Sequence, residues 1–320
     1  MLRHVDRLMT SPPPHLQTEA ATQPTRLPCV MVFNANDPSG VGGLSADVMA
    51  MSSASTHVLS VVTGSYVRDT TELHDHIAFD EEAVSDQARI VLEDIAVCAF
   101  KVGFVGTPAN LSVIAEVASD YPDVPLVAYM PDLSWMDRAD IETYLDAFAA
   151  LLLPQTTVLV GNHSTLCRWL LPEWEDNRLP TPRDVARAAA IHGASYTLVT
   201  GLGASDQHVE NHLASPESVL TTACCERIQA SFGGAGDTLS AALTALLACG
   251  ADLQTACAQA LAYLDQCLGA GFQPGMGRAV PDRLFWAHDD DDLDSPADTE
   301  NEVVDSAAQA GDFPLNPTQH

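Results

Sequence analysis

The sequence has a single lysine, Lys101, and only 14 Lys and Arg residues together, against 43 Asp and Glu residues. Its formal net charge is −29 at pH 7. Proteins that hold nucleic acid need clustered Lys and Arg to neutralise the phosphate backbone. The charge balance therefore argues against nucleic acid as the main partner, although a small anionic nucleotide can still bind through backbone amides, Mg²⁺ and a few arginines.

The sequence also lacks the cysteine spacing of a metal or disulfide protein. Its eight cysteines include no C-x-x-C pair, the spacing typical of many zinc sites. Cys249 and Cys257 lie in apolar, helix-like runs, where a free cysteine behaves as a small hydrophobic residue. Neither zinc nor a disulfide framework is indicated, and we expect a reducing, cytoplasmic compartment.

Long apolar segments are absent as well. No run is long enough to span a membrane, and residues 1–27 lack the apolar core of a signal peptide. These 27 residues contain several prolines and no periodicity, so they predict a disordered segment. The stretch 289–320 is acidic, without Lys or Arg, and predicts a solvated, disordered tail. Residues 28–288 are expected to form one domain without a membrane partner.

Within this domain, apolar strand-like runs alternate with helix-like stretches. The strand-like runs are residues 30–33, 58–63, 99–104, 125–129, 157–160 and 196–200. Examples of the helix-like stretches are residues 81–97, 139–152 and 182–192. The alternation predicts an α/β fold with a largely parallel sheet and helices on both faces. Ligands are expected at the carboxyl ends of the strands.

A glycine-rich loop precedes one of the apolar helices. Residues 233–238 read GGAGDT and lead into the apolar stretch 239–249. Glycines let the backbone approach an anion closely, and the free N–H groups of a first helical turn favour negative charge. Asp237 lies where a carboxylate can take up a proton. An aspartate that merely caps the helix is an equally good interpretation of this residue alone.

A second glycine-rich turn lies near the start of the domain. Residues 30–47 read VMVFNANDPSGVGGLSAD, a short strand followed by a turn with three glycines and then a helix. Two such turns between a strand and a helix suit a small ligand held at the edge of an α/β sheet.

Together, these segments resemble the hydroxymethylpyrimidine/phosphomethylpyrimidine kinases of thiamine biosynthesis, in the ribokinase superfamily. The matching segments are NDPSGVGGLSAD, residues 60–63, residues 101–103, residues 152–154, Asn162, GGAGDTLSAAL and residues 274–286. They follow the family order from about residue 28 to residue 287. The resemblance implies a ribokinase-like three-layer sandwich, ATP as co-substrate, Mg²⁺ as cofactor and, by analogy with relatives of this fold, a homodimer.

The resemblance assigns catalytic roles to the glycine-rich loop at residues 233–238. Asp237 is expected to be the base, and the N–H groups of Gly234, Ala235 and Gly236 are expected to form an anion hole for the transferred phosphoryl group. Most pyrimidine kinases of the family carry cysteine at this position, whereas sugar kinases of the superfamily carry aspartate. This departure favours Asp237 as the base and weakens the assignment of the exact substrate.

The resemblance also implies a set of substrate contacts. They are Ala35, Gly42, Asp47, Arg68, Phe104 and Pro131. Asp47 could accept a hydrogen bond from an exocyclic amine, and Phe104 could pack against a flat ring. Arg68 replaces a glutamine that usually contacts the ring, and a guanidinium has donors but no acceptor. Arg68 therefore changes the ring edge that can be recognised, unless it is simply a solvated arginine.

On the nucleotide side the resemblance implies Asn162, Thr165, Thr200 and Gly201. Thr165 stands where the family usually has a glutamate that helps to organise Mg²⁺, and Thr200 stands where a lysine is common. Tyr129 lies where an aspartate often ends a central strand; Asp132 could substitute for it by a shift of register. The metal ligands stay open, and weaker nucleotide binding than in typical relatives is predicted.

Three functions follow from these residues. The first is ATP-dependent phosphorylation of 4-amino-5-hydroxymethyl-2-methylpyrimidine, of its monophosphate, or of both. The second is a kinase for another hydroxymethyl compound, pyridoxal-like or a sugar, motivated by Asp237 and Arg68. The third is a pyrimidine-binding protein that has lost efficient phosphoryl transfer, motivated by Tyr129, Thr165 and Thr200. The extent of the resemblance favours the first.

Overall fold

A computed structural model of the chain describes residues 27–288. The predicted disordered segment, except Leu27, and the predicted acidic tail lie outside these residues. The chain divides into two units, Met1–Phe285 and Trp286–His320, and the sheet and the candidate site belong to the first. The boundaries 28 and 288 of the expected domain stay a prediction. No helix among the described residues is both long and apolar enough to cross a membrane.

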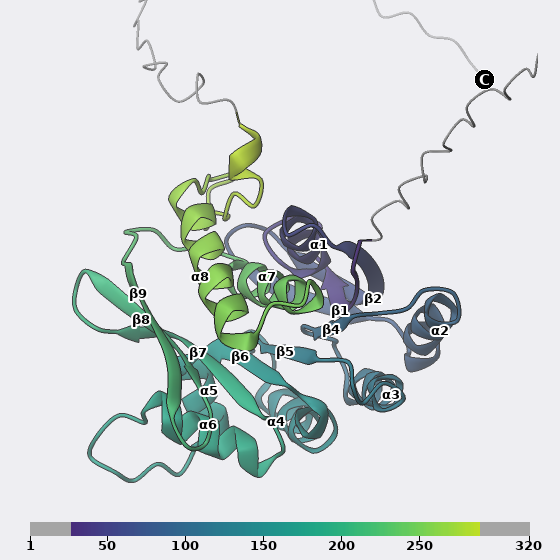
Figure 1. Cartoon of the computed structure of the whole chain (residues 1–320), viewed down its shortest axis with the longest axis horizontal. Helices are drawn as coiled ribbons and strands as arrows, with labels where there is room; N and C mark the ends of the chain where they lie inside the picture. Colours follow the sequence, from purple (N-terminus) through teal and green to yellow (C-terminus); the bar gives the residue numbers. More distant parts are fainter. Residues whose placement is uncertain (1–26, 289–320) are drawn as a thin grey trace, which may run out of the picture. The chain divides into compact units, whose positions relative to one another are not determined.

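The centre of the fold is one nine-stranded sheet in the order β3-β2-β1-β4-β5-β6-β7-β8-β9 (Figure 1). The strands are β1 (Cys29–Asn36), β2 (His57–Arg68), β3 (Leu73–Ala78), β4 (Ala99–Val102), β5 (Leu126–Met130), β6 (Val158–Asn162), β7 (Tyr196–Gly203), β8 (His208–Ala214) and β9 (Val219–Glu226). The six strands from β2 to β7 in this order pair in parallel. β3 pairs antiparallel at one edge, and β8 and β9 do so at the other.

Helices cover both faces of the sheet, as the sequence predicts. They are α1 (Gly43–Ser53), α2 (Glu81–Leu92), α3 (Pro108–Ser119), α4 (Arg138–Ala147), α5 (His163–Leu170), α6 (Pro182–Ile191), α7 (Ala235–Ala248) and α8 (Leu253–Gly269). A π-helical turn over Phe148–Leu152 and 3-10 turns over Leu153–Gln155 and Phe285–Ala287 complete the list. Helices α1, α7 and α8 lie on one face, and α2 to α6 lie on the other (Figure 1).

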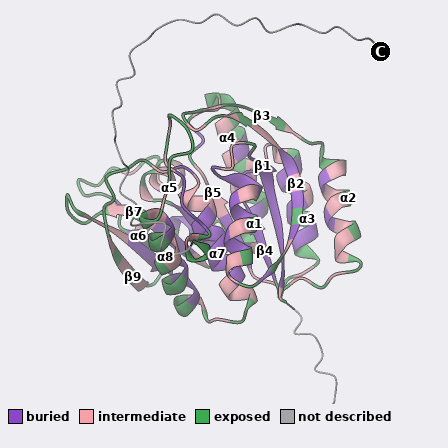
Figure 2. Ribbon diagram, turned by 90° about the horizontal axis from the view of Figure 1, so that it is seen from above, coloured by how far each residue is buried: buried purple, intermediate pink, exposed green. Residues whose placement is uncertain are grey.

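The two helical layers explain why the central strands are continuously apolar. Alternate residues of a strand point to opposite faces, so Met31 and Phe33 of β1 pack in the cluster with α3, whereas Val30 and Val32 pack with α1 and α7. Every residue of β1 except the last is buried, and buried residues fill the middle of the sheet in Figure 2. A strand buried on both faces can only be built from such a run.

The expected strands coincide with β1, β2, β4, β5, β6 and β7, and three further strands were not predicted. Strands β3, β8 and β9 carry polar and charged residues, as in HVENHLA of β8, because they lie at or near the sheet edges. The helix expected over 139–152 ends earlier, since α4 stops at Ala147 and the chain continues as the π-helical turn.

Candidate active site

The candidate site lies where the strand order reverses. β1 has β2 on one side and β4 on the other, so the loops that follow β1 and β4 leave in different directions and open a crevice at their carboxyl ends. A cavity of about 500 Å³ lies at this end of the sheet, lined from β2, β5 and the starts of α1 and α7. Its lining includes Gly43, Tyr66, Arg68, Thr71, Glu72, Leu73, Tyr129, Pro131, Asp132, Ser134, Trp135, the segment Phe232–Asp237 and Arg278.

Helix α7 begins at this cavity without a side-chain cap. Its N-cap residue is Gly234, whose φ of 73° lies in the left-handed region that favours glycine. A Cβ on Gly234 would collide with the carbonyl oxygen of Val41, because the two glycine-rich loops touch here. By contrast, the side chains of Asp80, Thr107 and Thr181 cap α2, α3 and α6. The first turn of α7 therefore keeps N–H groups for an anion.

Asp237 does not cap its own helix. It is the third residue of α7, and its Oδ2 accepts a hydrogen bond from the N–H of Gly43, at the start of α1, over 3.2 Å. The alternative interpretation, a plain N-cap aspartate, is thus wrong. The side chain is 16% exposed and lines the cavity, so one carboxylate connects the starts of two helices and faces the space where a ligand would lie.

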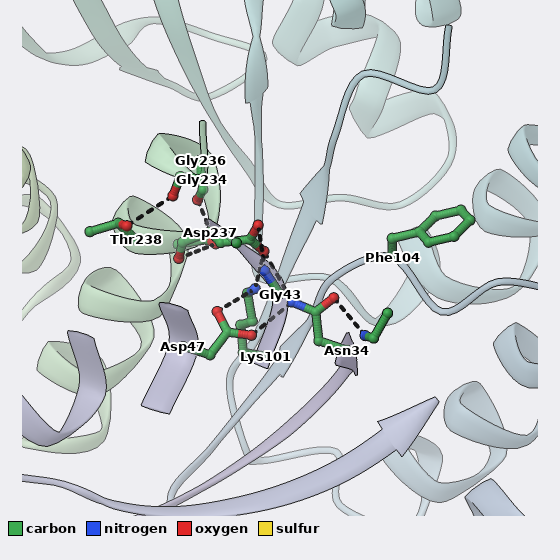
Figure 3. A network of polar contacts seen from close by, with 12 residues as sticks. Asn34, Gly43, Asp47, Lys101, Phe104, Gly234, Gly236, Asp237 and Thr238 are labelled. Carbon is green, nitrogen blue, oxygen red and sulfur yellow. Dashed lines mark hydrogen bonds and ion pairs between the residues drawn. The ribbon is translucent and has the colours of Figure 1, made fainter. Parts of the chain in front are cut away.

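A buried polar network surrounds Asp237 (Figure 3). The Lys101 ammonium, on β4, donates to Asp47 Oδ1 over 2.7 Å and to Asp237 Oδ1 over 3.0 Å. The Nδ2 group of Asn34, near the end of β1, donates to Asp47 Oδ2 over 2.8 Å and to Asp237 Oδ1 over 3.0 Å. Two carboxylates are thus bridged by one ammonium and one amide.

The network sets the charge of its members. Burial acts to raise the pKa of Asp237, but the Lys101 cation and the hydrogen bonds outweigh it and hold this pKa below its usual value. Burial dominates at Asp47 and raises its pKa to about 6, against the pull of Lys101. Burial acts to lower the pKa of Lys101, yet the two carboxylates raise it. Lys101 is therefore charged, and Asp237 is ionised, at neutral pH.

A buried arginine ties the two glycine-rich loops together. Arg283 is 2% exposed and donates from its Nη2 to the carbonyl oxygen of Val41 over 2.6 Å, from its Nη1 to that of Gly40 over 3.3 Å, and from its Nε to Thr238 Oγ1 over 2.9 Å. Because Thr238 is the residue after Asp237, this contact fixes the start of α7 against the loop that precedes α1.

The expected substrate contacts separate into two groups. Arg68 and Pro131 line the cavity, as do the expected catalytic residues Gly234–Asp237. Arg68 is not a solvated arginine: its side chain is 14% exposed, with Nη1 lying 3.5 Å from Asp37 Oδ2. Gly42 lies beside the cavity, because a Cβ there would come within 2.8 Å of Asp237 Oδ2.

The other expected contacts lie behind the cavity wall. Ala35 is fully buried. Asp47 is also fully buried, and its two carboxylate oxygens accept hydrogen bonds from Lys101 and Asn34, one each. The expected hydrogen bond from an exocyclic amine is therefore wrong for this structure: Asp47 orients the network instead. Phe104, 2% exposed, stacks on Tyr66 with ring centroids 5.9 Å apart, and Tyr66 rather than Phe104 faces the cavity.

The expected nucleotide contacts gather at the neighbouring strands. Asn162 and Thr200 pair across β6 and β7, and Gly201 packs against Asn162 with a φ of 75°. The Asn162 side chain accepts from the N–H of Ser164 over 3.0 Å and caps α5. Thr165 instead lines a second cavity of about 720 Å³ beside α4 and α5. None of the four lines the first cavity.

The described residues offer little to a metal ion. No group of three or more His, Cys, Asp or Glu within residues 27–288 could hold one. Asp132, the residue expected to substitute for an aspartate at position 129, is exposed and lies 3.1 Å from the Arg168 guanidinium. Asp47 and Asp237 already share the Lys101 ammonium. The residues of the site therefore fit a protein-held metal poorly.

Sequence reasoning missed the roles of several residues of the site. The buried network depends on Asn34 and Lys101. The cavity wall includes Tyr66 and Trp135, and the two glycine-rich loops are connected by Arg283. One signal was available: Lys101 is a single charge inside the apolar strand AFKV, and a charge in such a strand has to be paired. Its two partners come from distant segments, which no spacing rule indicates.

Comparison with known proteins agrees with this geometry. A profile of the phosphomethylpyrimidine kinase family matches residues 37–282. A hydroxymethylpyrimidine/phosphomethylpyrimidine kinase of Streptomyces coelicolor is 28% identical over 280 residues, which cover 84% of this chain and 98% of that relative. The protein of the same name from Mycobacterium tuberculosis is 27% identical over 269 residues, covering 81% and 94%.

Solved structures share the fold at lower identity. Bacillus subtilis pyridoxal kinase, solved as an ADP complex, superposes with a TM-score of 0.72 and 19% identity, covering 82% of this chain and all of that one. Phosphomethylpyrimidine kinase from Clostridium difficile gives a TM-score of 0.61 with 21% identity, covering 76% and 100%. The expected ribokinase-like fold is confirmed, and with the profile spanning both glycine-rich loops, the chain belongs to the phosphomethylpyrimidine kinase family.

Proposed function

We propose that this protein is an ATP-dependent kinase that phosphorylates 4-amino-5-hydroxymethyl-2-methylpyrimidine, its monophosphate, or both, in thiamine biosynthesis. The observation that carries the proposal is the joint placement of the uncapped start of α7 and the ionised Asp237 in one cavity. The match to curated kinases of this name over more than four-fifths of the chain supports the same substrate class.

The geometry supplies the parts of a phosphoryl transfer. The hydroxymethyl oxygen attacks the γ-phosphorus while the bond from that phosphorus to the bridging oxygen of ADP breaks, and Asp237 takes the hydroxyl proton. The N–H groups of Gly234, Ala235 and Gly236 stabilise the charge on the transferred group. Lys101 and Asn34 hold the carboxylate in place, so its orientation needs no rearrangement during the step.

Mg·ATP is the proposed phosphoryl donor. Structures with the same fold are named as complexes with ADP and with AMP-PCP, which supports a nucleotide here. Mg²⁺ usually keeps several waters and binds through nucleotide phosphates with one or two carboxylates. Because the described residues form no metal cage, we propose that the ion arrives on the nucleotide.

Arg68 favours a second candidate, a kinase for another hydroxymethyl compound such as a pyridoxal-like ring or a sugar. Its guanidinium faces the cavity where the family usually has glutamine, and it presents donors only. Pyridoxal is named in a solved complex of the same fold. We expect Arg68→Gln to shift the ratio of kcat/KM toward the aminopyrimidine without abolishing turnover; an unchanged ratio would show that Arg68 does not select the ring.

The deciding experiment measures ADP release with Mg·ATP and four acceptors: the hydroxymethylpyrimidine, its monophosphate, pyridoxal and ribose. We expect turnover on a pyrimidine, and a loss of about 10²–10⁴-fold in kcat for Asp237→Ala, the range for a missing general base. Asp86→Ala removes an exposed carboxylate on α2 and serves as the matched control. If the pyrimidines bind but no acceptor is phosphorylated, the protein is a binding relative of the kinases.

A cytoplasmic location and a homodimer also belong to the proposal. Both are expected from the family alone, and light scattering after gel filtration tests the dimer. A mass of one chain, 34.0 kDa, would contradict it.

A further inference from the structure

Tyr129 lies in the catalytic part of the cavity and has no role in the scheme above. It is the fourth residue of β5, and it lines the cavity together with Gly234, Gly236 and Asp237. A Cβ built on Gly236 would collide with the Tyr129 hydroxyl, so the phenol touches the first turn of α7 directly. Its hydroxyl therefore lies beside the N–H groups that are expected to receive the phosphoryl group.

None of the hydrogen bonds within residues 27–288 involves the Tyr129 hydroxyl. The hydroxyl is not one of the side-chain polar atoms that are both buried and without a partner. Because it has no partner among the described residues, it must be accessible, and the cavity that Tyr129 lines is the space it faces. Two other tyrosines show the contrast: the Tyr144 hydroxyl accepts from the N–H of Val105 over 3.2 Å, and the Tyr263 hydroxyl donates to the carbonyl oxygen of Arg283 over 2.8 Å. A free phenol in a polar cavity is a donor without an acceptor.

The surroundings keep this phenol protonated. Burial, followed by the charge of Asp237, raises the pKa of Tyr129 far above its ordinary value. The Lys101 ammonium lies 5.6 Å from the centroid of the Tyr129 ring, over its face, where a cation–π contact favours the position of the ring. The side chain is therefore held in place with its O–H group intact across the pH range in which a kinase works.

We propose that Tyr129 is a catalytic residue that donates a hydrogen bond to the phosphoryl group during its transfer, next to the backbone N–H groups of the α7 start. The proposal rests on the proposed function. At this position, where the resemblance leads one to expect an aspartate, a carboxylate would repel a phosphoryl oxygen, whereas the neutral phenol stabilises it. The tyrosine thus adds a donor to a phosphate site that lacks the usual lysine at Thr200.

Tyr129→Phe removes the hydroxyl and keeps the ring under Gly236. We expect kcat to fall about 10- to 100-fold, the range for one hydrogen bond to a charged group, with the KM of the acceptor changed by less than about two-fold, since the bond forms in the transition state. Tyr144→Phe is the matched control: it deletes a buried hydroxyl outside the cavity, so thermal stability falls and kcat does not.

A binding measurement separates this role from a structural one. Orthovanadate with ADP mimics the transferred phosphoryl group, and we expect Tyr129→Phe to weaken vanadate binding by the same factor while the affinity for ADP alone is unchanged. Equal vanadate affinity in wild type and variant overturns the proposal, whatever happens to kcat, and so does a wild type that binds no vanadate with ADP. Tyr129-dependent vanadate binding without turnover on any acceptor would instead overturn the proposed function.

Discussion

Lys101 holds two buried carboxylates together, and its removal would leave both without a counter-charge. We expect Lys101→Met to lower the free energy of unfolding by about 3–5 kcal/mol near neutral pH, as for other buried ion pairs broken on one side. Without the cation, the pKa values of Asp47 and Asp237 in the folded protein rise above those in the unfolded chain. As the pH falls, the folded variant then binds protons at a higher pH than its unfolded chain does. Its destabilisation relative to the wild type therefore becomes smaller at low pH.

Urea unfolding at about pH 8 and about pH 5 measures this effect. The double variant Asp47→Leu/Lys101→Met is the control, because it removes one charge of each sign and fills the space with apolar atoms; its stability should lie closer to that of the wild type. A Lys101→Met protein equally destabilised at both pH values would contradict the ion-pair account.

Asp47 gives the site a second titration. Its pKa of about 6 means that it takes up a proton while Asp237 is still ionised. Lys101 then has one anionic partner, Asp237, whose pKa falls further and whose strength as a base falls with it. The profile of kcat against pH should show a shallow shoulder near pH 6 and a steep loss only at a pH below the usual range of a free carboxyl group, because the pKa of Asp237 is lowered.

Asp47→Asn tests the origin of that shoulder, since the variant keeps the size of the side chain and removes its titration. We expect the shoulder to disappear and the steep acidic loss to remain. A shoulder that persists in the variant would have to come from another group.

At the scale of single residues, the sequence identifies the loop and its carboxylate but not what surrounds them. The run GGAGDT indicates an anion site, because glycine and an uncapped helix start are local properties. Asp47 was assigned to the substrate, whereas the structure places it behind the wall. Its partner Lys101 lies 54 positions away along the chain, and contacts over such separations follow from the packing of the sheet alone.

At the scale of elements, the connection between the two glycine-rich loops depends on Arg283. We expect Arg283→Met to lower the free energy of unfolding by about 3 kcal/mol or more, because two carbonyl oxygens and the Thr238 hydroxyl lose their buried charged donor together. Turnover should fall too, since the start of α7 loses its attachment to the loop before α1. Arg138→Met is the control: that guanidinium is 92% exposed, and its loss should leave the free energy of unfolding nearly unchanged. Equal effects of the two changes would contradict a role of Arg283 in connecting the two glycine-rich loops.

The strands differ in how well the sequence predicts them. The six parallel strands are recognisable in the sequence as apolar runs, and all six were predicted. Strand β9 reads VLTTACCE, with intermediate and exposed residues in alternation, because it lies at an edge and is covered on one face at most. Such a strand differs little from a loop in composition, and only its pairing with β8 defines it.

At the scale of the whole molecule, the net charge opposes the arrival of the nucleotide. ATP is anionic, and a charge of −29 repels it at long range. Salt screens this repulsion, with a Debye length of about 10 Å at 0.1 M. We therefore expect the association rate of Mg·ATP to increase when KCl is raised from about 20 mM to about 200 mM.

Stopped-flow fluorescence with a labelled ATP analogue measures this rate. The uncharged hydroxymethylpyrimidine is the control ligand, and its association should not depend on salt. An association rate for the nucleotide that falls with salt would show that local positive charge around Arg68 and Arg278 outweighs the field of the whole molecule.

The burial of Lys101 has a practical consequence for chemistry done on this protein. It is the only side-chain amine in the sequence, and none of its surface is exposed. Amine-reactive dyes, cross-linkers and coupling resins thus find no lysine on the folded surface. A label can reach Lys101 only when the network around Asp237 opens. The rate at which Lys101 is modified therefore measures how often the active site is transiently exposed.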